Sequence, residues 1–468
     1  MENHCAPRIR NHKEIEGMKF AKLLPFTLAA LSVQVLAAPP EVVARFESEA
    51  FYDDDAGNNS DADDPAIWAH PEDPAKSLVI ATLKEGGLVV LNMQGQTLQR
   101  IDAPMPPSAG DVPGRFNNVD VVYGLKARRH ENDFAVVIDR GSDKLRFYRI
   151  NPDYHSADID PLTDVTSPDA PWIFSDDQDE VNEQRTGYGL AVSKRKKHKD
   201  GYAVISQRED TDLAVAEFKM TKDGLMTYDV DDLTDLPDEF ELSDDVEWTP
   251  CQDEDGQDPQ VEGMVIDERN QVLYAAQEQV GVWRIPMDDP DAAELVDVVA
   301  SFGVPYTREW DEQEEEYVCT LLWDQDPGHG GQHLKADVEG LTIYYGPGKS
   351  GYLLASSQGD DRYVVYDRQG SNPYMGEFAI VDGPYTDGTQ ETDGGAVINV
   401  NMGPDFPYGL LVVQDGDNTP DELDEEGGKR DNTNFKFVPW QDIANSQFPP
   451  LMIDTESWRP RRKHRFPH

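Results

Sequence analysis

YLLASSQGDDRYVVYD, at Tyr352–Asp367, is an apolar run that ends in small and polar residues, turns, and is followed by a second apolar run. β-Branched and aromatic residues on both sides of a Gly/Asp turn are typical of paired strands. The same unit occurs five more times along the chain. The other copies are Ser77–Asn92, Phe134–Ile150, Tyr202–Phe218, Val272–Ile285 and Leu410–Trp440. Repetition of one strand–turn–strand unit indicates an all-β fold built from repeats.

Six such units, spaced by some tens of residues, predict a six-bladed β-propeller. The acidic stretches Asp231–Pro259 and Tyr306–Gly331 read as inserts between blades, and residues 39–58 as an arm or edge strand that helps to close the ring. A pair of β-sandwiches is the structural alternative. It explains the repeated unit less well.

The start of the chain has the pattern of an export signal. A basic segment, Met18–Lys22, precedes the apolar run Leu23–Leu36, and small residues follow it. We therefore expect a secreted or periplasmic protein that has no stable membrane association once the signal is cleaved. The expected divisions are 1–38 (N-terminal extension and signal peptide), 39–445 (propeller) and 446–468 (disordered tail). Met1 and Met18 both remain possible starts.

Acidic residues outnumber basic ones by 91 to 41, which gives the chain a formal charge of −50. Such a surface repels nucleic acid and anionic membranes, so neither is expected as a partner. Many of these carboxylates can be solvated surface groups, and some can be calcium ligands. Cys251 and Cys319 remain after signal cleavage. We expect them to form a disulfide in an oxidising compartment, with two free thiols as the alternative.

Each repeat carries polar residues just after its first strand, and in a propeller these positions meet at one end of the central channel. Three of them are cations, which suit phosphate oxygens, and others are acids, which suit hard metal ions. The cations are Lys84, Arg140 and Arg208, the acids are Glu209, Glu278 and Asp415, and Gln358 occupies the fifth repeat. Solvated strand ends would explain any single repeat, but not the grouping of cations in the early repeats and acids in the late ones.

Several motifs resemble those of the β-propeller phytases. DVEGLTIYY (Asp337–Tyr345) and DADDPAIW (Asp61–Trp68) are the most specific. The others are NNVD (Asn117–Asp120), VEGM (Val261–Met264), GYLLASSQG (Gly351–Gly359), TDGT (Thr386–Thr389), TDG (Thr392–Gly394), QDGDN (Gln414–Asn418) and NFKFVPW (Asn434–Trp440). The resemblance extends from about Asp61 to Ala444.

This resemblance implies a six-bladed propeller that holds several calcium ions, some structural and some in the active site at one end of the channel. It implies that Lys84, Arg140 and Arg208 hold substrate phosphates and that Gln358 lines the channel. The implied active-site calcium ligands are Asp64, Glu209, Glu262, Glu278, Asp337 and Glu339, with Asp63 as a close neighbour. The implied ligands of a structural calcium are Asp387, Asp415 and Asn418.

The expected activity is release of phosphate from phytate (myo-inositol hexakisphosphate), bound as a calcium complex by a monomeric enzyme. Water activated by calcium would attack in line, with Lys84, Arg140, Arg208 and Glu262 as the catalytic group. A calcium-dependent propeller lactonase and a secreted, non-enzymatic calcium-binding propeller are the alternatives.

The sequence departs from the family pattern at three places. Glu85 stands where a second lysine is frequent, which predicts the loss of one phosphate contact. Arg208 stands where lysine is common, which keeps the charge but changes its geometry. A tyrosine that belongs to a calcium site in some members is expected to be replaced near Thr186.

Overall fold

The computed structural model describes residues 38–54, 60–127, 130–156, 159–194, 201–243, 246–312, 316–424 and 427–457. The chain divides into Met1–Ala38 and a compact unit, Pro39–His468, and the account below concerns the second unit. Except for Ala38, the expected signal peptide lies outside the described residues.

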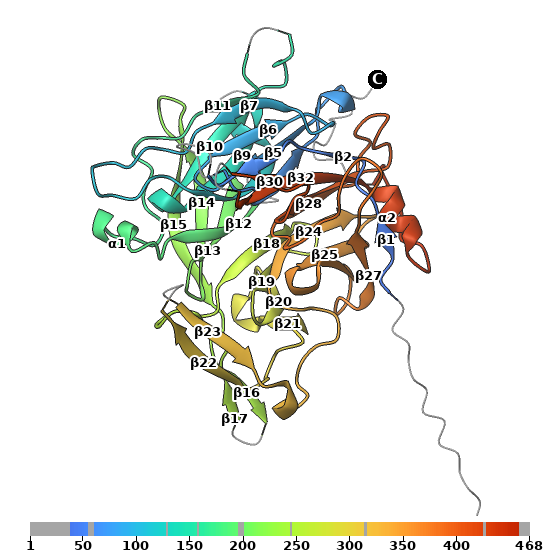
Figure 1. Cartoon of the computed structure of the whole chain (residues 1–468). Coiled ribbons are helices and arrows are strands. Elements are labelled where there is room, and N and C mark those ends of the chain that lie inside the picture. Colours follow the sequence, from blue (N-terminus) through green and yellow to red (C-terminus); the bar gives the residue numbers. More distant parts are fainter. Residues whose placement is uncertain are drawn as a thin grey trace, which may run out of the picture. The chain divides into compact units, whose positions relative to one another are not determined.

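Six sheets of four or five strands form the unit, which is a six-bladed β-propeller (Figure 1). Blade 1 contains β4 (Pro65–Trp68), β5 (Leu78–Thr82), β6 (Leu88–Leu91) and β7 (Thr97–Ile101). Blade 2 contains β8 (Phe116–Ala127), β9 (His130–Asp139), β10 (Lys144–Ile150) and β11 (Leu162–Asp164). Blade 3 contains β12 (Gly187–Lys194), β13 (Gly201–Gln207), β14 (Asp212–Met220) and β15 (Met226–Asp235).

The last three blades follow the same plan. Blade 4 contains β18 (Val261–Asp267), β19 (Val272–Gln277), β20 (Gly281–Pro286) and β21 (Glu294–Val298). Blade 5 contains β24 (Val338–Tyr345), β25 (Gly351–Ser357), β26 (Arg362–Asp367) and β27 (Tyr374–Ile380). Blade 6 contains β28 (Gly395–Ile398), β29 (Leu410–Asp415) and β32 (Asn432–Pro439). All pairings within blades are antiparallel, so each predicted strand–turn–strand unit supplies two adjacent strands of one blade.

The ring closes through its first strands and through the N-terminal arm. Each blade's first strand contacts the first strand of the next blade, and β28 contacts β4. In the arm, β2 (Phe46–Glu47) and β3 (Phe51–Tyr52) pair with β32, while β1 (Glu41–Val42) adds to β27 in parallel. This pairing covers the last blade's open edge, which would otherwise expose unpaired backbone groups.

Six buried apolar clusters form the core, and each one lies between two neighbouring blades. The cluster between blades 6 and 1, for example, joins Val79 and Val89 to Leu410 and Phe435. Because the β-branched residues of one blade pack on those of the next, the six repeats stabilise each other only as a closed ring.

Two short hairpins lie in the segments that connect blade 3 to blade 4 and blade 4 to blade 5. β16 (Phe240–Ser243) pairs with β17 (Val246–Trp248), and β22 (Tyr306–Asp311) pairs with β23 (Glu316–Leu321). The disulfide predicted between Cys251 and Cys319 is present and joins these two inserts. A third small hairpin, β30 (Glu422–Leu423) with β31 (Lys429–Arg430), lies within blade 6.

The C-terminal segment corrects one expectation. The tail was expected to be disordered from residue 446, yet residues 447–457 pack beside α2 (Trp440–Ser446) because Leu451 is apolar and becomes buried. The Leu451 amide donates to the Ala444 carbonyl at 2.9 Å, and the Asp454 amide donates to the Tyr344 hydroxyl at 2.8 Å. The basic run 458–468 lies outside the described residues.

The only other α-helix in the described parts of the chain is α1 (Gln178–Asn182), which lies between blades 2 and 3. Neither helix has the length or apolar character that crossing a bilayer requires.

Candidate active site

Four glycines, three on first strands and one directly before β28, allow neighbouring blades to approach closely at one end of the channel. A Cβ atom on Gly263 would lie 2.0 Å from the carbonyl oxygen of Glu339, so this position has no room for a side chain. The same holds where Gly189 meets Glu262 (2.1 Å), Gly340 meets Asp393 (2.7 Å) and Gly394 meets Asp63 (2.8 Å). The Glu-Gly and Asp-Gly pairs of the sequence therefore place an acid of one blade beside a glycine of the preceding one.

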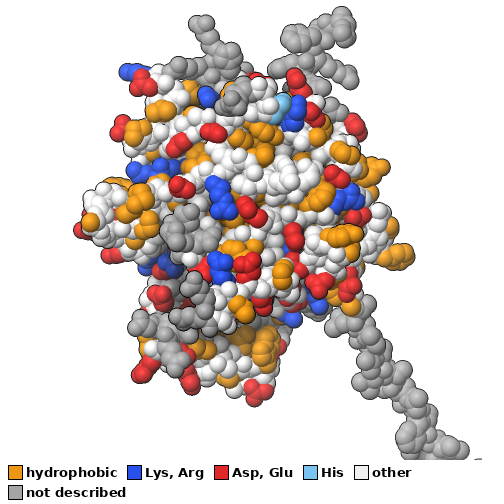
Figure 2. Space-filling model, turned by 45° about the horizontal axis from the view of Figure 1, so that its top comes forward, with side chains coloured by type: hydrophobic (Ala, Val, Ile, Leu, Met, Phe, Trp, Pro, Cys, Tyr) orange, Lys and Arg blue, Asp and Glu red, His pale blue; other side chains and the backbone are white. Residues whose placement is uncertain are grey.

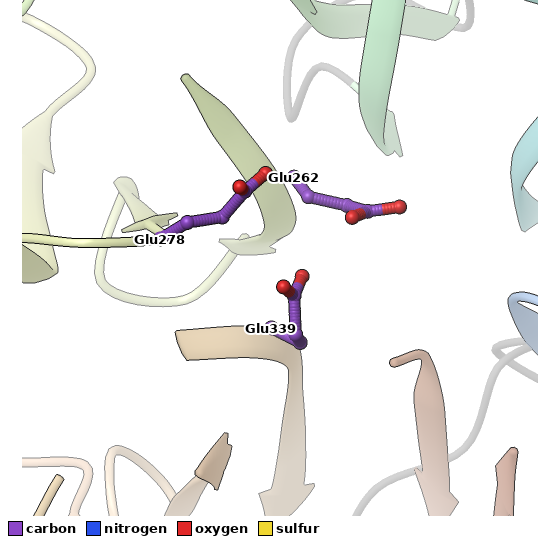
Figure 3. Close-up of side chains that lie close together, drawn as sticks. All are labelled: Glu262, Glu278 and Glu339. Carbon is purple, nitrogen blue, oxygen red and sulfur yellow. The ribbon is translucent and has the colours of Figure 1, made fainter. Parts of the chain in front are cut away.

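Three glutamates converge at this end. Glu262 on β18, Glu278 in the turn after β19 and Glu339 on β24 each place a carboxylate oxygen within 4.8 Å of the other two. Figure 3 shows the three side chains close together, each on a separate element. They are only 8%, 6% and 4% exposed. We call Glu262, Glu278 and Glu339 the carboxylate triad.

The carboxylate triad is held by neutral donors rather than by cations. Tyr188 and Asn117 each donate to Glu262 at 2.9 Å, and Gln260 donates to Glu278 at 2.8 Å. Burial, followed by neighbouring acids, raises the pKa of Glu278 and of Glu339 well above the ordinary value. One oxygen of Glu339, Oε2, is buried and has no hydrogen-bond partner. The triad thus holds more negative charge than its surroundings compensate.

The remaining acids expected at the mouth lie around this triad. Asp64 accepts a hydrogen bond from the Val119 amide at 3.0 Å, and Asp63 Oδ2 is buried without a partner. Burial and the charges of Asp253 and Glu262 raise the pKa of Asp337 to about 6, although a hydrogen bond from Gln279 opposes the shift. The charge of Glu262 also raises the pKa values of Asp63 and Asp64, which places them in the same electrostatic environment.

The three expected phosphate-binding cations border the acids. Lys84 Nζ lies 2.6 Å from Asp61 and 3.8 Å from Asp393. Burial lowers the pKa of Lys84, but Asp393, Asp63 and Asp61 together raise it above its ordinary value, so this ammonium stays charged. Lys84 has a positive φ of 46°, which the tight turn before Gly86-Gly87 imposes.

Arg140 and Arg208 lie in the turns that directly follow β9 in blade 2 and β13 in blade 3. The Arg140 guanidinium lies 5.8 Å from the centre of the Tyr188 ring, and its Nε is buried without a partner. Burial, then the charges of Arg115 and Arg208, lower the pKa of Arg140 to about 10, which still leaves it charged at neutral pH. Arg208 forms an ion pair with Glu209, the remaining acid expected at the mouth.

On the face shown in Figure 2, Lys and Arg side chains lie singly or in small groups among acidic ones. Arg140 differs from such paired surface cations because its guanidinium has no ion pair among the described residues.

Gln358 is hydrogen-bonded to Asp393, the acid that faces Lys84. Its amide donates to Asp393 Oδ1 at 2.7 Å, while Asp393 Oδ2 faces Lys84. Burial and the charges of Glu262 and Asp61 raise the pKa of Asp393 to about 7.

Asp387, Asp415 and Asn418 form a second polar group, around the fully buried Lys436. The ammonium of Lys436 contacts Asp387, and it lies 3.1 Å from Asp415, 2.8 Å from Glu47 and 3.1 Å from Asn418. Three carboxylates against one ammonium leave an excess of two negative charges, which matches one divalent cation.

Sequence reasoning missed several site residues. A calcium-site tyrosine of some family members was expected to be replaced near Thr186, and no role was assigned to Tyr188, two residues further on, which donates to Glu262. Asn117 and Asp393 lie in motifs that were noted without assigning either residue a role. Nothing in the sequence pattern pointed to Gln260, which donates to Glu278 and accepts from the Glu209 amide at 2.9 Å.

The geometry fits hard divalent cations held by oxygen atoms. Calcium accepts six to eight oxygens in loose geometry, and the carboxylate triad offers several, including the unpartnered Glu339 Oε2. A bound cation would reverse the local field and allow an anionic substrate to approach Lys84 and Arg140.

Comparison with known proteins supports one family. The sequence model of that family, Phytase, matches residues 15–233 and 326–464. The interval between the two matched parts contains Glu262 and Glu278. The curated 3-phytase of Bacillus subtilis (strain 168) is 31% identical over 425 residues, which cover 90% of this chain and 90% of that protein.

Solved structures resemble the chain more distantly. Chaetomium thermophilum Sqt1, bound to the N-terminus of ribosomal protein L10, has a TM-score of 0.39 and 11% identity, over 85% of this chain and 90% of that chain. A chain of the Mitotic Checkpoint Complex has a TM-score of 0.35 and 9% identity, over 90% of this chain and 99% of that chain. Likeness at this level supports no conclusion about function.

Proposed function

The chain belongs to the phytase family, and from this premise we propose that it is a calcium-dependent phosphoric monoester hydrolase that releases phosphate from phytate. The observation that carries the proposal is the convergence of the carboxylate triad with Lys84 and Arg140 at one end of the channel. Tyr188 supports this proposal, because its hydroxyl donates to Glu262 at 2.9 Å while its ring lies 5.8 Å from the Arg140 guanidinium.

In this proposal the carboxylate triad, with Asp64, Asp337 and Glu209, holds the active-site calcium ions. When bound, calcium supplies positive charge against the phosphoryl oxygens and makes water more acidic. Tyr188 and Asn117 orient Glu262, and Gln260 orients Glu278, so that their remaining lone pairs face the site. The group Asp387, Asp415 and Asn418, with Glu47 and Lys436, holds a structural ion.

Lys84, Arg140 and Arg208 bind the phosphate groups of the substrate. Lys84 stays protonated between Asp61 and Asp393, and Arg140 has free donors because its guanidinium lies outside any ion pair among the described residues. These charges stabilise the negative charge that develops on the phosphoryl oxygens during transfer. Gln358 keeps Asp393 in position opposite Lys84.

We further propose that the substrate arrives as its calcium complex, that the enzyme is a monomer, and that it acts outside the cytoplasm, either secreted or periplasmic. The charge of −50 supports the first point, because free phytate would be repelled by the protein surface. It also argues against nucleic acid as a partner and against lasting association with anionic membranes.

The proposal is tested by phosphate release from phytate near neutral pH, after treatment with EGTA and again after calcium is restored. We expect activity only with calcium. Replacing Lys84 by alanine should lower kcat/KM by roughly a hundredfold, because it removes a charge-assisted phosphate contact. Lys76→Ala is the control, since Lys76 pairs with Asp73 on the surface and should leave activity unchanged. Folded, calcium-loaded protein that releases no phosphate would contradict the proposal.

A further inference from the structure

Arg115 lies between two of the cations of the site. It immediately precedes β8, and the amide of the next residue, Phe116, donates to the Lys84 carbonyl at 3.1 Å. On its other side, the Gly141 amide donates to the Arg115 carbonyl at 3.4 Å, directly after Arg140. The backbone of Arg115 is thereby fixed next to both Lys84 and Arg140.

The glycine at position 141 shows how close this approach is. A Cβ atom there would lie 2.7 Å from the Arg115 amide nitrogen, so the turn that carries Arg140 could not contact this segment with any other residue. The Arg115 amide also donates to Asp139 Oδ1 at 3.1 Å. Arg115 is therefore held by backbone contacts that do not depend on its side chain.

The Arg115 side chain is only partly neutralised. Its Nη1 forms an ion pair with Glu85, the residue at which the loss of a phosphate contact was expected. Its Nε is buried and has no hydrogen-bond partner among the residues that the structure describes, as is also true of Arg140 Nε. The charge of Arg115 is close enough to Arg140 to contribute to the lowered pKa of that guanidinium.

A purely structural ion pair accounts for Glu85 but not for the two unpartnered nitrogens. Buried donors without partners are costly, and like charges held together add to that cost. An anion that accepts hydrogen bonds from both guanidinium groups would remove both costs, and Arg forks suit phosphate oxygens.

We propose that Arg115 is a phosphate-binding residue of this site, and that Glu85 competes with a substrate phosphate for its guanidinium. The inference rests on the proposed phytase function and deepens it by naming a specificity-determining pair. Arg115 supplies a positive charge beside the position where Glu85 places a negative one. Binding of a highly phosphorylated inositol displaces Glu85 from Arg115.

The test compares Arg115→Ala, Arg115→Lys and Glu85→Gln with the calcium-loaded wild type. Arg115→Ala should raise KM for phytate roughly ten- to hundredfold, as expected for loss of one charge-assisted contact, while kcat changes by less than about threefold. Arg115→Lys should recover part of the loss, because the charge returns without the fork. Glu85→Gln should lower KM about two- to fivefold, because a competing carboxylate is removed.

Binding of inositol hexasulfate, followed by calorimetry, measures the same contacts without turnover. Its Kd should shift in the same direction in each variant, and the gain from Glu85→Gln should disappear when Arg115 is already alanine. Arg284→Ala is the control, since Arg284 forms an ion pair with the exposed Glu294 on blade 4. Melting temperature shows whether each variant is folded.

Two results have different meanings. If the wild type is active and Arg115→Ala and Arg115→Lys keep both KM and Kd within about twofold, Arg115 is structural and the inference is wrong. If the wild type releases no phosphate at all, the proposed function fails, while the inositol hexasulfate titration still decides whether Arg115 contacts an anion.

Discussion

The two ends of strand β18 carry buried acids in opposite electrostatic states. At one end, Asp267 is bound by Arg368 through two hydrogen bonds of 2.5 and 2.9 Å, and both side chains are 0% exposed. Burial raises the pKa of Asp267, but the bonds and charge of Arg368 lower it further, so the net shift is downward. At the other end, Glu262 belongs to the carboxylate triad, whose members Glu278 and Glu339 have raised pKa values.

The two ends of this strand differ in whether the protein itself neutralises the buried acid. At the Asp267 end the protein satisfies the acid by itself, because both carboxylate oxygens of Asp267 accept hydrogen bonds from protein donors. The Glu262 end leaves an excess of negative charge and an unpartnered oxygen on Glu339. Buried acids that the protein does not neutralise indicate a site for an external cation.

The largest expected effect that sharpens this comparison is the response of stability to pH in calcium-free protein. Burial raises the pKa of Asp393 from 3.8 to about 7 and that of Asp337 from 3.8 to about 6. Because these folded-state values lie above the unfolded ones, their stabilising contribution is full below pH 4 and is lost as pH rises toward 7. The loss is on the order of 4 kcal/mol for a shift of three units.

With calcium bound, stability should rise rather than fall as pH increases, because calcium binds the ionised carboxylates. Denaturant unfolding at several pH values, with EGTA and with calcium, checks the prediction. Asp267 acts in the opposite sense, since its lowered pKa gives stability that is lost only as pH falls through that value. Parallel slopes with and without calcium would contradict the account.

Removing Arg368, the partner of Asp267 at the end of β18, should have the next largest effect, which is on stability. Arg368→Met leaves Asp267 buried without its cation and should lower the free energy of unfolding by about 3–5 kcal/mol. Phosphate release per folded molecule should not change, because Arg368 lies outside the site. Chemical unfolding and activity assays measure the two quantities. Arg284→Met is the control and should cost less than about 1 kcal/mol.

A smaller change in stability, of the opposite sign, is expected when one acid of the carboxylate triad is neutralised. Glu339→Gln removes one uncompensated charge, so calcium-free protein should become more stable by about 1–2 kcal/mol. The same variant should lose most of its stabilisation by calcium and most of its activity. Thermal unfolding with EGTA and with calcium measures both changes. A calcium-free variant less stable than the wild type would show that Glu339 is a structural residue.

The repeats were sufficient to predict the ring. The hairpin turns follow directly from the repeated unit, so Lys84, Arg140, Arg208 and Glu278 could be placed at one end of the channel. Residues that act across blades could not be found in this way. Tyr188 matters only because blade 4 brings Glu262 within hydrogen-bond distance, and Gln260 only because Glu278, 18 residues further along the chain, lies within reach of its amide. No local pattern records either distance.

The C-terminal boundary was missed for a similar reason. Residues 447–457 contain too few apolar positions to predict an ordered segment. Leu451 is nevertheless buried against residues that are distant in the sequence. Glu47 shows the same limit, since it belongs to the N-terminal arm and contacts Lys436 across a long separation in sequence.

Equilibrium dialysis against radioactive calcium most directly tests whether the carboxylate triad at the Glu262 end of β18 binds calcium. Wild-type protein and a variant with Glu262, Glu278 and Glu339 all changed to glutamine would be compared at neutral pH, with folding checked by circular dichroism. We expect the variant to bind fewer calcium ions than the wild type and to release no phosphate from phytate. Equal numbers of bound ions in the two proteins would contradict the account.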